Sequence, residues 1–155
     1  MLFETDDDEL TLRLVLTWEP EDLDLTRDGL GEQILDAAAE AMRGSALREE
    51  DPDGFPWPAL APATARAKGD ARVGFRTGQM IGDLSRGETA VEPRSATWRY
   101  PRGGTWPRAH GFHNGGHGRP PRRLVGWTEA AKGTASSLLA GAAGAPPGDD
   151  QADRS

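Results

Sequence analysis

Apolar and polar residues alternate in several stretches of the chain, and a period of two along the sequence predicts strands. The stretch "TLRLVLTW" places three leucines on one side of such a strand, Leu12, Leu14 and Leu16. Two shorter runs, Thr89–Val91 and Ala96–Tyr100, are separated by turn residues and predict a hairpin. A last run, "RRLVGW", predicts a closing strand. Trp18 and Trp98 lie on strand-like runs, so we expect both in the core.

A long helix is predicted between residues 25 and 50, where apolar residues recur at helical spacing. The residues that define this spacing are Leu30, Ile34, Ala37, Ala38, Ala41 and Met42. Thr26 or Asp28 is expected to cap the start of the helix, and Gly44 to kink or end it. The alanine-rich body makes this the strongest helix signal in the sequence.

Three further helices are expected. Pro62 is a typical first-turn residue for a short helix over 63–68. The stretch "RTGQMIGDLSRG" predicts a second short helix with Thr77 as its cap, and "TEAAKGTASSLLAG" predicts a terminal helix capped by Thr128. The residues between 69 and 75 read as a linker, and Met1–Glu9 are acidic and expected to be solvated.

These elements predict an α+β fold, in which a long N-terminal helix packs on a small antiparallel sheet with one or two short helices. A chain of 155 residues suits one domain, which we expect over residues 1–141. The polar, low-complexity stretch 142–155 is expected to form a flexible C-terminal tail.

Acidic and basic residues are separated along the chain. Residues 1–53 hold 17 acidic and 4 basic residues, a net charge of −13, whereas residues 54–132 hold 5 acidic and 13 basic ones, a net charge of +8. This separation has two physical interpretations. Either the two halves attract each other within one fold, or copies of the chain pack head to tail, acidic face on basic face.

All three histidines, His110, His113 and His117, lie in the stretch "AHGFHNGGHGRPPRRLVGW". On a helix their spacing would place them on one face, and zinc binds imidazole nitrogens. Several glycines argue against a helix there, however, and the chain has no cysteine and no carboxylate between Glu92 and Glu129. We therefore expect a polar loop, no metal and no cofactor. A histidine-metal hydrolase stays a distant alternative.

The same stretch brings Arg119, Arg122 and Arg123 close in sequence to three aromatic residues, Trp106, Phe112 and Trp127. This composition suits nucleic-acid binding. The other interpretation pairs these arginines with carboxylates of the same chain or of a neighbour, and the acidic first third of the chain favours it. Tryptophans at the edges of elements are either packed under a loop or exposed as interface anchors.

Catalytic patterns are weak. The serines lie in no nucleophile-elbow pattern, no phosphate-binding loop is present, and the acidic runs resemble solvated faces. We expect no enzymatic activity. No signal peptide is expected, and no apolar run approaches the roughly 20 residues that span a bilayer. The expectation is a soluble cytoplasmic protein that does not contact a membrane.

Four segments, taken in order, resemble the phage virion morphogenesis family, the tail-completion and head–tail joining proteins of tailed bacteriophages. They are "DPDGFPWPALAPATARAKG", "RTGQMIGDLSR", "AHGFHNGG" and "RPPRRLVGW". The family pattern combines an N-terminal helix, a "DPxGxxWxxL" loop followed by threonine and lysine, a "TGxLxxS" helix start, a hairpin, a "YAxxHxxG" segment and a "PARxFLG" closing strand.

The positions that match this pattern in the first two segments are Asp51, Pro52, Gly54, Trp57, Leu60, Thr64, Lys68, Thr77, Gly78, Met80 and Ser85. Those in the last two segments are Ala109, His110, His113, Gly115 or Gly116, Pro121, Arg122, Leu124, Val125 and Gly126. The chain departs from the pattern where Met80 replaces the usual leucine, where Pro121 directly precedes Arg122, and in "RYPRGGTWPR", which resembles an insertion.

The resemblance implies a structural protein of the phage neck that completes the tail or joins it to the head, assembled in the bacterial cytoplasm. It implies a homo-oligomeric, hexameric ring between connector or adaptor proteins and tail terminator or tail tube proteins. DNA would pass through its lumen without sequence-specific binding. The interface candidates are Phe55, Trp57, Trp106, His110, His113, Arg119, Arg122 and Arg123. A nucleic-acid-binding protein that uses the Arg119–Arg123 loop is the alternative.

Overall fold

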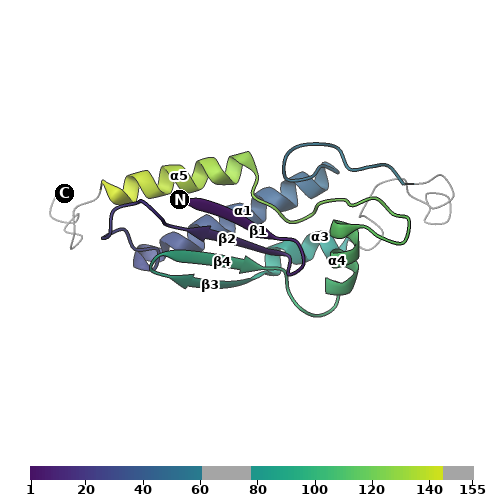
Figure 1. The fold of residues 1–155 in the computed structure, drawn as a ribbon, viewed down its shortest axis with the longest axis horizontal. Coiled ribbons are helices and arrows are strands. Elements are labelled where there is room, and N and C mark those ends of the chain that lie inside the picture. Colours follow the sequence, from purple (N-terminus) through teal and green to yellow (C-terminus); the bar gives the residue numbers. More distant parts are fainter. Residues whose placement is uncertain (61–77, 145–155) are drawn as a thin grey trace.

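A four-stranded antiparallel sheet forms the centre of the computed structural model, which describes residues 1–60 and 78–144 (Figure 1). The strand order is β1-β2-β4-β3. Strands β1 and β2 form one hairpin, and β3 and β4 form another. The strands are β1 (Leu2–Asp6), β2 (Thr11–Val15), β3 (Glu88–Glu92) and β4 (Ser95–Arg99). The predicted strand β2 and hairpin β3–β4 are confirmed, and so is the α+β class.

One face of the sheet is buried and the other is open. Leu12 and Leu14 of β2 are fully buried, and their cross-strand partners on β4, Trp98 and Ala96, are buried with them. Because side chains alternate along a strand, the residues between these leucines point to the opposite face. Glu4 and Arg13, which face each other across β1 and β2, are half exposed there. The sheet therefore has one covered face and one polar face.

Helix α1 (Leu30–Leu47) covers the buried face and packs on β3 and β4, behind the strands in Figure 1. Its inward side carries the predicted apolar residues, among them Ile34 and Met42. Gly31 permits this approach, because a Cβ at that position would lie 2.5 Å from a methyl carbon of Val91. The helix also continues past Gly44 to Leu47, so the expectation that Gly44 ends it is wrong.

The start of α1 differs from the prediction. A short 3-10 turn, η1 (Arg27–Gly29), precedes the helix, and Gly29 in the left-handed region is its N-cap, with no side-chain cap hydrogen bond. The Thr26 hydroxyl instead donates to Asp24 Oδ1 at 2.6 Å. Asp28 is itself left-handed, with φ of +55°. Neither predicted cap residue caps the helix.

Four more helical segments follow. They are α3 (Gln79–Gly82), the 3-10 turn η2 (Asp83–Arg86), α4 (Trp106–Asn114) and α5 (Glu129–Ala143). Helix α3 matches the second predicted short helix and has Gly78 as its N-cap. Helix α5 packs against α1 and begins as predicted, with the Thr128 hydroxyl accepting from Ala131 N at 3.0 Å.

Three further expectations are wrong. Met1–Glu9 are not simply solvated, because Leu2–Asp6 pair with β2. The run "RRLVGW" belongs to none of the strands and contributes buried Leu124 and Val125 to the core without a strand partner. Trp98 is buried as predicted, but the Trp18 side chain is 93% exposed. The predicted helix over 63–68, the linker over 69–75, Thr77 and residues 145–155 of the predicted tail over 142–155 lie outside the described residues, while α5 continues to Ala143, two residues into that predicted tail.

Candidate functional site

The glycine- and histidine-rich stretch forms a helix and not the expected loop. Helix α4 contains His110, Gly111 and His113, with a proline in its first turn. A glycine inside a helix costs only about 1 kcal/mol. Buried Ala109 and His113 offset that cost by packing into the core. The glycines therefore do not prevent a helix here, because tertiary packing outweighs local propensity.

His113 is a buried structural histidine. Its side chain is 1% exposed, and Nδ1 accepts hydrogen bonds from the backbone N–H groups of Leu124 and Val125 at 3.1 and 3.2 Å. Nε2 therefore carries the proton and donates to Asp7 Oδ1 at 2.7 Å. Burial lowers the pKa of His113 below its ordinary value of 6.5, and the hydrogen bond to Asp7 only partly opposes this. With both nitrogens engaged and the ring neutral, His113 has no lone pair for a metal or a substrate proton.

Asp7 connects three segments that are far apart in sequence. Besides His113, its carboxylate accepts from Arg123 Nη2 at 3.0 Å, and its backbone carbonyl accepts from Asn114 Nδ2 at 2.9 Å. The β1–β2 turn is thereby fixed to the end of α4 and to the segment before α5. Sequence reasoning missed this residue, because Asp7 is one acid among five between Glu4 and Glu9.

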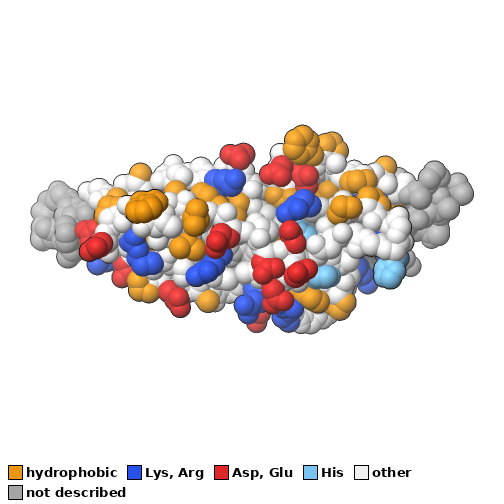
Figure 2. All heavy atoms as spheres, in the orientation of Figure 1, with side chains coloured by type: hydrophobic (Ala, Val, Ile, Leu, Met, Phe, Trp, Pro, Cys, Tyr) orange, Lys and Arg blue, Asp and Glu red, His pale blue; other side chains and the backbone are white. Residues whose placement is uncertain are grey.

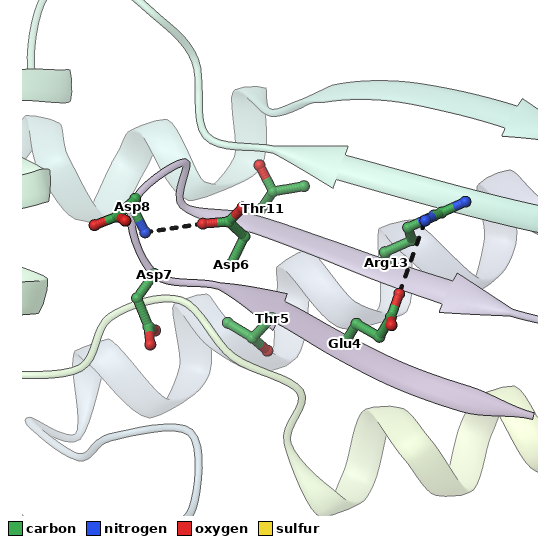
Figure 3. Close-up of a pocket in the computed structure, with 7 residues that line it drawn as sticks. All are labelled: Glu4, Thr5, Asp6, Asp7, Asp8, Thr11 and Arg13. Carbon is green, nitrogen blue, oxygen red and sulfur yellow. Dashed lines mark hydrogen bonds and ion pairs between the residues drawn. The ribbon is translucent and has the colours of Figure 1, made fainter.

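The remaining acids of that turn do not converge on a common point. Figure 3 shows the depression of about 500 Å³ that they line on the sheet side of the turn, with the Asp7 side chain pointing away from Asp6 and Asp8. Asp6 Oδ1 accepts from the backbone N–H groups of Asp8 and Glu9, and Glu4 pairs with Arg13 at 3.9 Å. These carboxylates build the turn and the strand pair. Within residues 1–60 and 78–144, no group of three or more His, Asp or Glu side chains is placed to hold a metal.

Arg122 binds two segments together from the interior. Only 8% of this residue is exposed, and its guanidinium donates to the backbone carbonyls of Pro58 and Ala59 at 2.8 and 3.0 Å. Burial lowers the pKa of Arg122 below its ordinary value, with neighbouring Arg119 as a smaller cause. Its backbone N–H donates to Phe112 O at 2.9 Å.

Trp57 adds to this contact. We call the contacts of Trp57, Phe112 and Arg122 together the clamp. Its Nε1 donates to Arg123 O at 2.8 Å, and its ring meets the Phe112 ring edge-on at 4.9 Å. Pro52 lies so close to Gly126 that a Cβ on the glycine would be 2.8 Å from a proline carbon. The clamp thus joins the segments 51–60, 109–114 and 119–127, three of the four segments on which the family resemblance rests.

The eight interface candidates fall into two groups. Trp57, His113 and Arg122 are buried within the protein, so their side chains do not reach its surface. Phe55, Arg119 and Arg123 are exposed, while Trp106 and His110 are half-buried. His110 lies beside Trp106 with ring centroids 5.0 Å apart, and the Arg102 guanidinium lies 4.4 Å from the Trp106 ring centroid on the loop before α4.

Ion pairs within the chain link its acidic and basic parts. Asp7 pairs with Arg123, and Glu9 pairs with Arg102 at 2.6 Å. Figure 2 shows this acidic turn as a red cluster with blue arginine side chains around it. These two ion pairs lie within one chain, as the first interpretation of the charge separation predicts, and Arg119 is left as an exposed cation of the basic segment.

No family model, curated protein or solved structure matches this chain. Among the described residues, no helix combines the length and the apolar character needed to cross a membrane.

Proposed function

We propose that this protein is a structural component of the neck of a tailed bacteriophage, where it completes the tail or joins it to the head as one copy of a hexameric ring. Its neighbours are a connector or adaptor protein on the head side and a tail terminator or tail tube protein on the tail side. Genomic DNA passes through the lumen without sequence-specific contacts. It catalyses no reaction, and it assembles in the host cytoplasm before it becomes part of the virion.

One observation carries this proposal. The segments that resemble the virion morphogenesis family are distant in sequence, yet three of them pack on one another in the clamp through Trp57, Phe112 and Arg122. Shared short motifs that arise by chance have no reason to meet in space. Motifs that define one structural unit do, so the clamp supports reading the segments as a single inherited unit.

The nucleic-acid alternative is less favoured by the arrangement of the arginines. Phosphate binding needs cations that are free to meet the backbone of DNA. Arg122 is buried against backbone carbonyls, and Arg123 is paired with Asp7. Of the three arginines in the predicted loop, this leaves Arg119 without such an engagement, too little for a surface that tracks a phosphate chain.

Deletion of the gene from a prophage that carries it tests the proposal directly. We expect induced lysates to contain DNA-filled heads and separate tails, visible by negative-stain electron microscopy, with infectivity restored by the intact gene supplied in trans. Normal virions from the deletion strain would overturn the proposal.

A second measurement separates the two function classes. Binding of purified protein to random duplex DNA, followed against salt concentration, should show no more than weak affinity, and Arg119→Ala should not change it. Tight binding that falls steeply with salt and is weakened by Arg119→Ala would favour the nucleic-acid alternative.

A further inference from the structure

Trp18 is the most exposed large apolar residue in the described part of the chain, at 93%. A surface tryptophan of this kind would be expected to pack against its own chain. The loop that carries Trp18, residues 17–23, is instead held in place by several hydrogen bonds, and we call it the braced loop. Arg94 donates to the carbonyls of Glu19, Pro20 and Leu23 at 2.7 to 3.0 Å. The Glu19 carboxylate in turn accepts from Thr17 N at 2.9 Å and from the N-terminal ammonium at 3.0 Å.

This bracing fixes the backbone on both sides of the exposed indole. A pre-organised loop loses little conformational entropy when it binds a partner. More of the free energy gained by burying its side chain therefore appears as binding affinity. Trp18 also has apolar neighbours in the fold. Leu2, 51% exposed, faces Val15 across the β1–β2 pair, three residues before Trp18. Figure 2 shows apolar side chains gathered at this end of the open sheet face.

An apolar hollow lies in the loop before α4. It has a volume of about 250 Å³ and is lined by Arg102, Gly103, Gly104, Trp106 and Pro107. An apolar cavity of roughly 150 Å³ holds a benzene molecule. An indole has about one and a half times as many ring atoms as benzene, which scales to roughly 225 Å³, so the hollow is large enough for one tryptophan side chain.

The braced loop and the hollow lie at different ends of the molecule. The loop follows β2 at the left end of the strands in Figure 1, and the hollow lies between β4 and α4 on the right, so a Trp18 side chain cannot reach the hollow of its own chain. The charges are complementary. Residues 14–26 contain four acids and no base, whereas residues 99–128, which include the hollow, contain no acid and six arginines. Glu9 pairs with Arg102 at the hollow and neutralises one of these cations.

We propose that Trp18 of one copy inserts into the Arg102–Pro107 hollow of the next copy, in a head-to-tail contact. Such a contact is heterologous, the kind that closes into a ring when the rotation between copies permits it. This inference deepens the self-association part of the proposed function and does not depend on the phage setting. The indole would pack on Trp106 and Pro107, and acids of the braced loop would face the arginines around the hollow.

Cysteine cross-linking tests the contact, because the natural chain contains no cysteine. Thr17→Cys places a thiol beside Trp18, and Gly103→Cys places one at the hollow, where a Cβ meets no atom within 4 Å. The two single variants are mixed at high concentration and treated with a short bismaleimide. We expect the mixed Thr17→Cys and Gly103→Cys product to predominate over both like-with-like products.

Trp18→Ala in the Thr17→Cys background should lower the mixed product about 30-fold, the loss typical of removing a hot-spot tryptophan. Leu47→Ala, which removes another exposed apolar side chain outside the interface candidates, is the matched control and should leave it unchanged. Circular dichroism confirms that each variant is folded. Cross-linking that is absent, that is unaffected by Trp18→Ala, or that joins mainly Thr17→Cys to itself overturns the head-to-tail contact.

The two proposals fail separately. Rings seen by electron microscopy without the mixed cross-link would overturn the Trp18 contact and support the ring of the proposed function. The mixed cross-link together with normal virions from the gene-deletion strain would support the contact and overturn the neck assignment.

Discussion

Two adjacent arginines, Arg122 and Arg123, should differ strongly in what they contribute to stability. Arg122 is 8% exposed and donates two hydrogen bonds to backbone carbonyls, whereas 46% of the Arg123 side chain is exposed and its partner Asp7 is equally accessible. Substitution of each by alanine therefore compares a buried cation with an exposed one at neighbouring positions of the same segment.

The expected cost of Arg122→Ala follows from these contacts. A hydrogen bond from a charged donor contributes about 1.5 to 3 kcal/mol. Pro58 and Ala59 are exposed residues, so water can replace the lost donors and the lower value applies, about 3 kcal/mol for two bonds. Relief from burying an unpaired cation returns about 1 kcal/mol of this. We expect a net loss of about 2 kcal/mol for Arg122→Ala and about 0.5 kcal/mol for Arg123→Ala.

Urea unfolding followed by far-ultraviolet circular dichroism measures this difference. With a urea dependence of about 2 kcal/mol per molar, Arg122→Ala should lower the midpoint by about 1 M and Arg123→Ala by about 0.25 M. Arg122→Lys should fall between them, because an ammonium cannot span both carbonyls as the planar guanidinium does. Equal midpoints for the two alanine variants would refute the interpretation of Arg122 as a clamp residue.

Two glycines should respond to alanine with opposite signs. Gly87→Ala should destabilise the protein by about 1 to 3 kcal/mol, because its Cβ would fall 1.9 Å from Trp98 Nε1 in the core. Gly133→Ala, on the open side of α5, should stabilise it by about 0.5 to 1 kcal/mol. Thermal unfolding of both variants checks this, and a change of the same sign in both would contradict it. Stability should also depend on pH through His113, whose pKa is lowered on folding by burial, so that the unfolded chain binds the proton first as the pH falls below 6.5. The His113 contribution is therefore intact above pH 6.5 and is lost as the pH falls through the lower pKa of the folded state. In His113→Gln, the urea midpoint should therefore depend less on pH over that window. An unchanged dependence would show that other groups cause the loss of stability.

Local pattern was sufficient for β2, the β3–β4 hairpin, α1 and α5, because each buries one regular face and its signal lies within its own residues. Leu12 and Leu14 alternate on β2, Ile34 and Met42 recur on α1, and Thr128 caps α5 with a hydroxyl that needs only a neighbouring N–H. These positions carry the information for their own conformation, so the α+β class could be predicted without knowledge of the fold.

The candidate site required the tertiary structure, because its residues owe their roles to partners far along the chain. Asp7 resembles its acidic neighbours until His113 and Arg123 meet it, and Arg122 resembles a surface cation until the carbonyls of Pro58 and Ala59 enclose it. Trp18 and Trp98 lie on similar alternating runs, but only Trp98 remains within the sheet, where its neighbours cover it. Periodicity determined which segments form elements, while burial and long-range pairing decided what each polar or aromatic side chain contacts.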